Sequence, residues 1–173
     1  MKLLILRALS YFLISIAIVG CAENSPNQNY YDISKSPYVN EMEKSFAIVE
    51  SATKQLHILD TDYQYARISA EEYTVLRGNQ VAIIKDEVDK QDITISAIKG
   101  LSPPYEAKKY HDLLVMYYAV HMSSYSYLLK SIVNPDENVR KNAHEYSTKL
   151  MLELDSRENE VDKEYERYLK SKK

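Results

Sequence analysis

The fold is decided by residues 69–100, which read SAEEYTVLRGNQVAIIKDEVDKQDITISAIKG. Ser69 followed by Glu72 matches a capping box, in which two side chains satisfy free backbone N–H groups at a helix start. Apolar residues then recur at alternating spacings of three and four, and Gly100 stands where a glycine commonly ends a helix. The stretch therefore predicts a single helix of about 30 residues, or about 45 Å.

Three further helix starts flank this segment. Ser36-Pro37 and Ser102-Pro103 each offer a capping serine with proline at the first helical position, where a missing N–H has no cost. Asn134-Pro135-Asp136-Glu137 combines a cap, a proline and an acidic residue. The joints after Gly100 and Asn134 are short, so the helices that flank them are predicted to be antiparallel neighbours.

All four segments carry a seam of heptad-like spacing, which is typical of helices packed at shallow angles. The predicted seam positions are Val39, Met42, Phe46, Val49, Thr53 and Leu56; Tyr73, Leu76, Gln80, Ile84, Val88, Gln91, Ile95 and Ile98; Ala107, Tyr110, Leu114, Tyr117, His121, Ser124 and Leu128; and Val139, Ala143, Tyr146, Leu150, Leu154, Val161, Tyr165 and Tyr168. These seams predict an all-α fold, an up-down-up-down four-helix bundle over residues 36–173. The fourth helix looks longest, and we expect its end to project beyond the bundle.

Composition agrees with an all-α fold. The chain has only 3 glycines and no tryptophan, but 16 tyrosines. Scarce glycine and abundant Glu, Lys, Leu, Ala and Ile favour helix over strand. Tyrosine suits a thin bundle because its ring packs inward while its hydroxyl reaches water.

Residues 1–20 have the three parts of a secretory signal. Lys2 and Arg7 supply the positive region, residues 8–19 the apolar region, and Gly20 the small residue before a cleavage point. The alternative is an uncleaved membrane anchor, which needs roughly 20 apolar residues. Arg7 interrupts the apolar stretch, so we favour a cleaved signal.

Ile18-Val19-Gly20-Cys21 resembles the lipobox of bacterial lipoproteins. The resemblance implies that Cys21 becomes the first residue of the mature protein and carries two or three acyl chains, palmitate among them, enough for stable anchoring. Cys21 is the sole cysteine, so no intramolecular disulfide can form. Ala22 in place of aspartate points to the outer membrane if the host is Gram-negative. We therefore expect a membrane-anchored protein on the extracytoplasmic side.

Residues 21–35 are polar after the cysteine and read as a tether of about 15 residues, spanning on the order of 20 Å. Loss of residues 1–20 removes two basic residues and no acidic one, which leaves 20 basic against 25 acidic residues. An acidic balance lacks the basic footprint of a nucleic-acid binder. The sequence thus predicts three parts: signal 1–20, lipidated tether 21–35 and bundle 36–173.

The four histidines show no metal-binding spacing. They form no His-x-x-x-His pair, and none follows a glutamate by three residues as in di-iron bundles. His121 is the best candidate ligand for a haem or metal because it falls on a seam, although a histidine there is more often a packing residue. His57, His111 and His144 are predicted to lie at the surface or at a boundary.

Tyrosines cluster on the third helix, where Tyr110 and Tyr117 share one face and Tyr118 and Tyr125 another. Aromatic surfaces can hold sugars or partner side chains; the alternative is that these rings line the boundaries of the bundle. Together with His121, residues Tyr110, Tyr117 and Tyr125 are the candidate binding residues. Polar seam positions, namely Thr53, Gln80, Gln91, His121 and Ser124, set the helix register or mark a wet cavity.

No catalytic motif is present: no glycine-rich phosphate loop, and no nucleophile spaced beside a base and its orienting group. Leu101-Ser102-Pro103-Pro104-Tyr105 is similar to a joint in uncharacterised bacterial helical lipoproteins, a likeness that implies architecture only. The sequence thus predicts a non-catalytic, lipid-anchored interaction or binding module of the cell envelope, with an envelope protein or the cell wall as partner. The alternatives are a haem- or metal-binding bundle and a homo-oligomer joined through the fourth helix.

Overall fold

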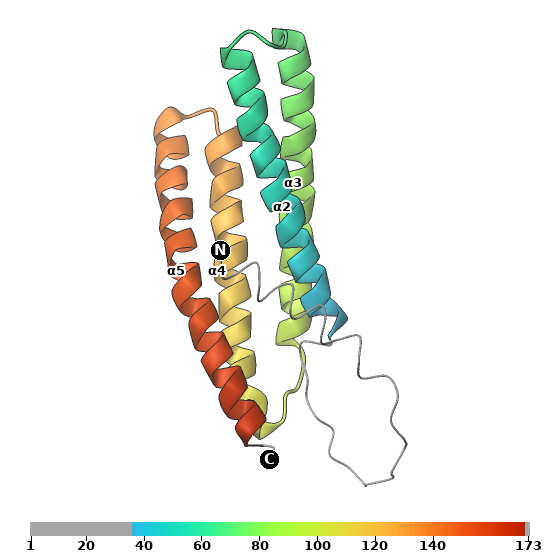
Figure 1. The fold of residues 1–173 in the computed structure, drawn as a ribbon, viewed down its shortest axis with the longest axis vertical. Coiled ribbons are helices and arrows are strands. Elements are labelled where there is room, and N and C mark those ends of the chain that lie inside the picture. The colour runs from blue at the N-terminus through green and yellow to red at the C-terminus, as the bar shows by residue number, and fades with distance from the viewer. Residues whose placement is uncertain (1–35, 172–173) are drawn as a thin grey trace. The chain divides into compact units, whose positions relative to one another are not determined.

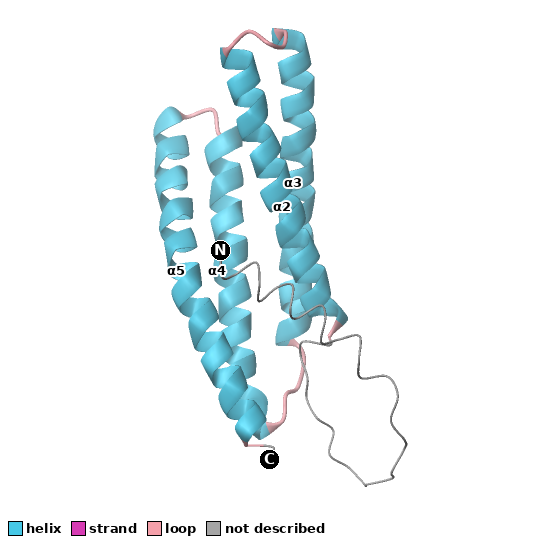
Figure 2. Cartoon of the chain, in the orientation of Figure 1, coloured by secondary structure: helices cyan, strands magenta, loops and turns pink. Residues whose placement is uncertain are grey.

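Residues 36–171, the part of the chain that the computed structural model describes, form four α-helices and no strand (Figures 1 and 2). The helices are α2 (Pro37–Gln64), α3 (Ala70–Lys99), α4 (Lys108–Val133) and α5 (Glu137–Lys170), and a 3₁₀ turn, η2 (Tyr105–Ala107), precedes α4. The predicted all-α bundle with its up-down-up-down order is confirmed. The predicted signal, Cys21 and the tether lie outside the described residues.

The bundle consists of two helical hairpins. Helices α4 and α5 pack closely along each other, as do α2 and α3, and α3 joins the two hairpins by packing on α4 (Figure 1). Helices α2 and α5 are not among the closely packed pairs. The bundle is therefore closed on the side of α3 and α4 and open between α2 and α5.

Helix starts follow capping chemistry. Ser69 Oγ accepts a hydrogen bond from the Glu72 backbone N–H at 3.1 Å, as the capping box predicts. Before α5 the cap is Asp136, which accepts from the N–H groups of Asn138 and Val139. Asn134, the predicted cap, instead accepts from the Asp136 N–H at 2.9 Å and so belongs to the turn. Asp136 rather than Asn134 caps α5 because the Asp136 carboxylate also interacts favourably with the positive end of the helix dipole.

The predicted start of α4 at Ser102-Pro103 is wrong. Residue Pro103 precedes a second proline, and a residue before proline is pushed out of the helical region towards extended backbone. Pro104 is itself extended, with ψ at 155°, and the chain then enters η2. Helix α4 begins only at Lys108, and no side chain caps it.

The core follows the predicted seams most closely at the end of the bundle that holds the first turns of α2 and the last turns of α3 and α5 (Figure 1). The buried apolar seam residues include Val39, Met42, Phe46, Val49, Leu56, Ile84, Val88, Ile95, Ile98, Tyr110, Leu114 and Val161. Tyr146 is an exception, since 57% of its surface is exposed. Its ring lies at the edge of the contact with α4, stacked on Tyr127 at 5.2 Å, while its neighbour Ser147 is buried and donates a hydrogen bond to the Ser124 carbonyl oxygen at 2.8 Å. Small side chains at this contact let the two backbones approach.

The end of α5 packs against α4, so the prediction that it projects as an arm is wrong. Tyr168 is only 2% exposed, and its ring lies 6.4 Å from that of Tyr110. Tyr165 contacts the same ring at 4.9 Å, and Lys109 Nζ lies 2.7 Å from the Glu164 carboxylate. The regular tyrosine spacing that follows the charged stretch 153–160 is what keeps the last turns on the bundle.

The turn between α2 and α3 projects instead. Arg77 donates a hydrogen bond to the Ile132 carbonyl oxygen in the last turn of α4, at 3.1 Å. The parts of α2 and α3 beyond that point pack mainly on each other, with the Tyr63 and Tyr73 rings stacked at 4.4 Å (Figure 1). This end of the molecule lies away from the core.

Candidate functional site

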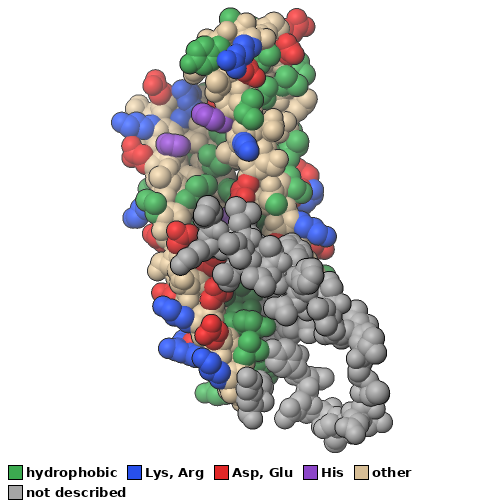
Figure 3. All heavy atoms as spheres, in the orientation of Figure 1, with side chains coloured by type: hydrophobic (Ala, Val, Ile, Leu, Met, Phe, Trp, Pro, Cys, Tyr) green, Lys and Arg blue, Asp and Glu red, His purple; other side chains and the backbone are tan. Residues whose placement is uncertain are grey.

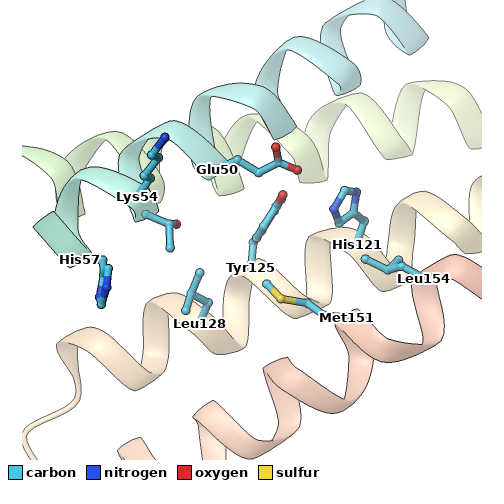
Figure 4. A pocket seen from close by; sticks show the side chains of 9 residues that line it. Glu50, Lys54, His57, His121, Tyr125, Leu128, Met151 and Leu154 are labelled. Atoms are coloured by element: carbon cyan, nitrogen blue, oxygen red, sulfur yellow. The ribbon is translucent and has the colours of Figure 1, made fainter. Parts of the chain in front are cut away.

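A cavity of about 440 Å³ opens between α2, α4 and α5, on the side where α2 and α5 do not pack together. We call it the α2–α4–α5 cavity (Figure 4). It is lined by Glu50, Thr53, Lys54 and His57 of α2, His121, Tyr125 and Leu128 of α4, and Met151 and Leu154 of α5. Its volume lies within the range of small-molecule sites, 300–1,000 Å³ by order of magnitude.

Helix α2 contributes the polar wall. Its lining residues lie three and four positions apart, which places them on one face of the helix. Thr53 Oγ1 donates to the Val49 carbonyl oxygen at 2.8 Å, so its hydroxyl is engaged within its own helix. Neither Glu50 nor Lys54 forms an ion pair with any residue between positions 36 and 171. Two opposite charges of this wall are thus available to a ligand.

The floor of the cavity is apolar and comes from the other hairpin. Leu128 of α4 and Met151 and Leu154 of α5 line it. Figure 4 shows Lys54 and His57 towards one end, near Leu128, with Glu50, Tyr125 and His121 towards the other. The cavity is therefore amphipathic across its width, and its two ends differ.

An aromatic cluster forms the second end. The His121 ring lies 3.7 Å from that of Phe46 and 4.8 Å from that of Tyr125, and the Phe46 and Tyr125 rings are 5.8 Å apart in an edge-to-face arrangement. Aromatic pairs at such separations contribute beyond their buried area. Packing of this kind restricts the rings to one arrangement and shapes this end of the cavity.

Tyr118 continues the cluster into the core. It is 4% exposed, and its ring lies 5.8 Å from that of Phe46. Burial raises the pKa of the Tyr118 phenol well above its ordinary value, with a further contribution from the Glu43 carboxylate. The phenol is neutral at physiological pH, as a buried ring without a compensating cation must be.

The four candidate binding residues do not form one surface. His121 and Tyr125 line the α2–α4–α5 cavity, and the Tyr117 ring lies 5.8 Å from that of His121. Tyr110 is 5% exposed and packs against the end of α5, about 16 Å from His121 along the helix axis. Both Tyr110 and Tyr125, the latter 3% exposed, are buried, as expected of rings that pack within the bundle rather than form an open aromatic surface.

The histidines divide into exposed and buried. His57 and His144 are exposed as predicted, whereas the prediction for His111 is wrong, since it is only 4% exposed. Burial lowers the pKa of His111 below its usual value near 6.5, partly offset by the Asp112 carboxylate. Within residues 36–171 no group of three or more His, Cys, Asp or Glu side chains lies close enough to hold a metal ion.

Two polar seam residues mark the cavity, and one sets a helix contact. Thr53 and His121 both line the α2–α4–α5 cavity. Gln91 instead lies between α2 and α3, where its Nε2 donates to Ser45 Oγ at 2.9 Å. Ser45 Oγ in turn lies 3.4 Å from the Glu87 carbonyl oxygen. Gln91 thus fixes the register of the first hairpin.

Sequence reasoning missed four cavity residues: Glu50, Lys54, His57 and Met151. For the three on α2 the signal is local, because Thr53 replaces an apolar residue in the α2 seam one turn from Glu50 and His57 and next to Lys54. Thr53 in the α2 seam and His121 in the α4 seam are both polar where an apolar residue is expected. Two such positions on facing helices indicate a space that apolar side chains do not fill. Met151 has no such signal, since it lies beside the predicted seam position Leu150.

The surface around the cavity is mixed in charge. Figure 3 shows acidic, basic and hydrophobic side chains intermixed over this face, with no large patch of one charge. None of the helices within residues 36–171 is both long and apolar enough to cross a membrane. Comparison of the chain with known protein families, with curated protein sequences and with solved structures finds no match.

Proposed function

We propose that this chain is a lipid-anchored, non-catalytic binding module of the bacterial cell envelope. It is held at the membrane by lipid on Cys21, on the extracytoplasmic side and on the outer membrane if the host is Gram-negative. The observation that carries the binding role is the α2–α4–α5 cavity, a built and amphipathic site in a chain without a catalytic motif. Its ligand or an envelope partner would be met close to the membrane surface.

Anchoring rests on the resemblance of Ile18-Val19-Gly20-Cys21 to a lipobox. The non-catalytic role is supported by the cavity lining, which contains no serine or cysteine. Its aliphatic hydroxyl, on Thr53, donates to the backbone of its own helix rather than to a base. An aliphatic hydroxyl acts as a nucleophile only when a base activates it, so this arrangement of Thr53 favours binding.

Metabolic labelling tests the anchor. Cells expressing the full chain are grown with an alkyne analogue of palmitate, and the chain is isolated from membrane and soluble fractions. We expect label on the membrane-bound chain, and loss of both label and membrane association in Cys21→Ala. A chain that carries no label, or a Cys21→Ala variant that remains in the membrane, would refute the lipoprotein assignment.

Binding of haem is the second candidate, and one observation favours it. His121 and Met151 come from different helices and both line the α2–α4–α5 cavity, and a His/Met pair is a known axial ligand set for haem iron. Haem titration of the full chain tests this candidate, with absorbance spectra recorded for the wild type and for Met151→Leu. A Soret shift that saturates at one haem per chain and changes in the variant would support it; an unchanged free-haem spectrum would dispose of it.

A further inference from the structure

The side chains that line the α2–α4–α5 cavity indicate which class of ligand it takes. Resting on the proposed binding function, we infer that the α2–α4–α5 cavity binds an elongated amphiphile with an acidic head, such as a carboxylate on an alkyl chain. Its head meets Lys54 and His57, and its apolar body lies along Leu128, Met151 and Leu154.

The shape of the cavity favours an elongated body. Its α2 wall runs from Glu50 to His57, or about 10 Å along the helix axis. A volume of about 440 Å³ corresponds to roughly 15 groups of the size of a water molecule. An alkyl chain of about ten carbons with its head group matches that size. Leu128, Met151 and Leu154 line the same cavity, so an alkyl chain within it buries apolar surface, which is favourable.

The charges place the head at one end. Lys54 forms no ion pair with any residue from 36 to 171, and its flexible stem can carry the ammonium group over the cavity mouth. His57 lies three residues further along the same face and can donate a ring N–H. Glu50 lies one turn away in the other direction, towards Tyr125 and His121 (Figure 4). An acidic head at Lys54 therefore avoids the Glu50 carboxylate, whereas a reversed ligand would face it.

Photo-labelling of the full chain tests this inference. The probe is a carboxylate of about ten carbons with a diazirine near the chain end, added to whichever cell fraction contains the protein. Two matched probes carry a trimethylammonium or an alcohol head on the same chain. After irradiation, modified residues are mapped by mass spectrometry. We expect the carboxylate probe to label peptides that contain Leu128, Met151 or Leu154.

Paired variants separate the cavity from general surface adsorption. Met151→Trp fills the cavity and should abolish labelling, whereas Leu152→Trp places the same ring on the outer face of α5, where Leu152 is 77% exposed, and should leave it unchanged. Lys54→Gln alters an exposed side chain and cannot unfold the bundle. It should reduce labelling by the carboxylate probe about threefold, the scale of an exposed ion pair, and leave the alcohol probe unaffected.

Equal or stronger labelling by the trimethylammonium probe would overturn the acidic head. Labelling that survives Met151→Trp, or that is no greater at the cavity than around Leu152, would overturn the site. These outcomes do not depend on the anchor, because cavity labelling can be read in a soluble fraction. A chain that lacks lipid but labels in the cavity would refute the anchored function and keep the ligand class.

Discussion

Gln91 occupies a place in the α3 seam that leucine or isoleucine would otherwise take, and it is fully buried. Its Nε2 donates to Ser45 Oγ, but its Oε1 accepts no hydrogen bond within the described residues. A buried amide that is only half satisfied gives up stability. What it provides is a directional contact between α2 and α3, which apolar side chains of the same volume would not supply.

Substitutions of Ser45 and of Gln91 should lower the free energy of unfolding by different amounts. Ser45→Ala leaves the Gln91 Nε2 group buried without its acceptor and should lower the free energy of unfolding by about 1–2 kcal/mol. Gln91→Leu removes both buried polar atoms and should change it by less than about 0.5 kcal/mol. Urea unfolding of both variants and of the double variant checks this. The double variant should be more stable than Ser45→Ala alone, and an additive loss would contradict the account.

His111 gives the bundle a pH dependence. Burial lowers its folded-state pKa below the ordinary 6.5, so the unfolded chain binds the proton more readily. The stability contributed by the neutral ring is complete above that value and is lost as the pH falls through about 6.5 towards the folded-state pKa. Lys108 acts in the same direction as burial, and Asp112 opposes it.

We expect the free energy of unfolding to decrease between pH 7.5 and pH 5.5, values that bracket the ordinary histidine pKa of about 6.5. His111→Gln should be less stable at the higher pH but should show a smaller decrease across this interval. Urea unfolding at both pH values measures it, with His144→Gln as the control for an exposed ring. A pH dependence unchanged in His111→Gln would show that another group causes it.

Helix ends show where sequence signals are strong and where they fail. Capping at Ser69 was predictable because cap and glutamate act within one turn. Asn134 and Asp136 are both good caps two residues apart, so local sequence alone does not choose between them. Seam positions drift for a related reason: an ideal helix turns about 20° per heptad away from a strict repeat. Tyr146, one heptad after Val139, has turned by only about 20°, so its exposure reflects its place at the edge of the α4 contact, where its ring stacks on Tyr127.

Two serines make a matched test of capping. Ser69 accepts a hydrogen bond from Glu72, whereas Ser36, which precedes α2, makes no side-chain cap bond. Ser69→Ala should lower the free energy of unfolding by about 1 kcal/mol, and Ser36→Ala by less than about 0.5 kcal/mol. Chemical denaturation of the two variants gives both numbers. Equal losses would mean that the cap bond at Ser69 contributes nothing of its own.

At the scale of the whole bundle, the sequence predicts four seams but not how two hairpins close. The α2–α4–α5 cavity exists because α2 and α5 stay apart, and their separation is set by all the side chains of the aromatic cluster and the α3–α4 contact together. No short stretch of sequence records that separation. Thr53 marks the α2 face that carries Glu50 and Lys54, but Met151 looks like an ordinary surface residue until the helices are placed in space.

The same arrangement predicts uneven local stability. Beyond Arg77 the α2–α3 hairpin has few buried side chains, whereas residues 110–125 lie in the core. Amide hydrogens in residues 58–76 should exchange markedly faster than those of residues 110–125, because local opening there exposes little apolar surface. Hydrogen exchange followed by mass spectrometry checks this. Uniform protection would mean that the projecting turn is held by contacts beyond the described bundle.

Crosslinking in living cells tests the central claim, an anchored module that binds through its cavity. A photoreactive amino acid replaces Met151 in the full chain, or replaces the outward-facing Leu152 as the control, each with Cys21 intact and with Cys21→Ala. We expect a discrete adduct at position 151, recovered with the membrane, that is absent at position 152 and lost in Cys21→Ala. No adduct at position 151, or the same adducts at both positions, would contradict it.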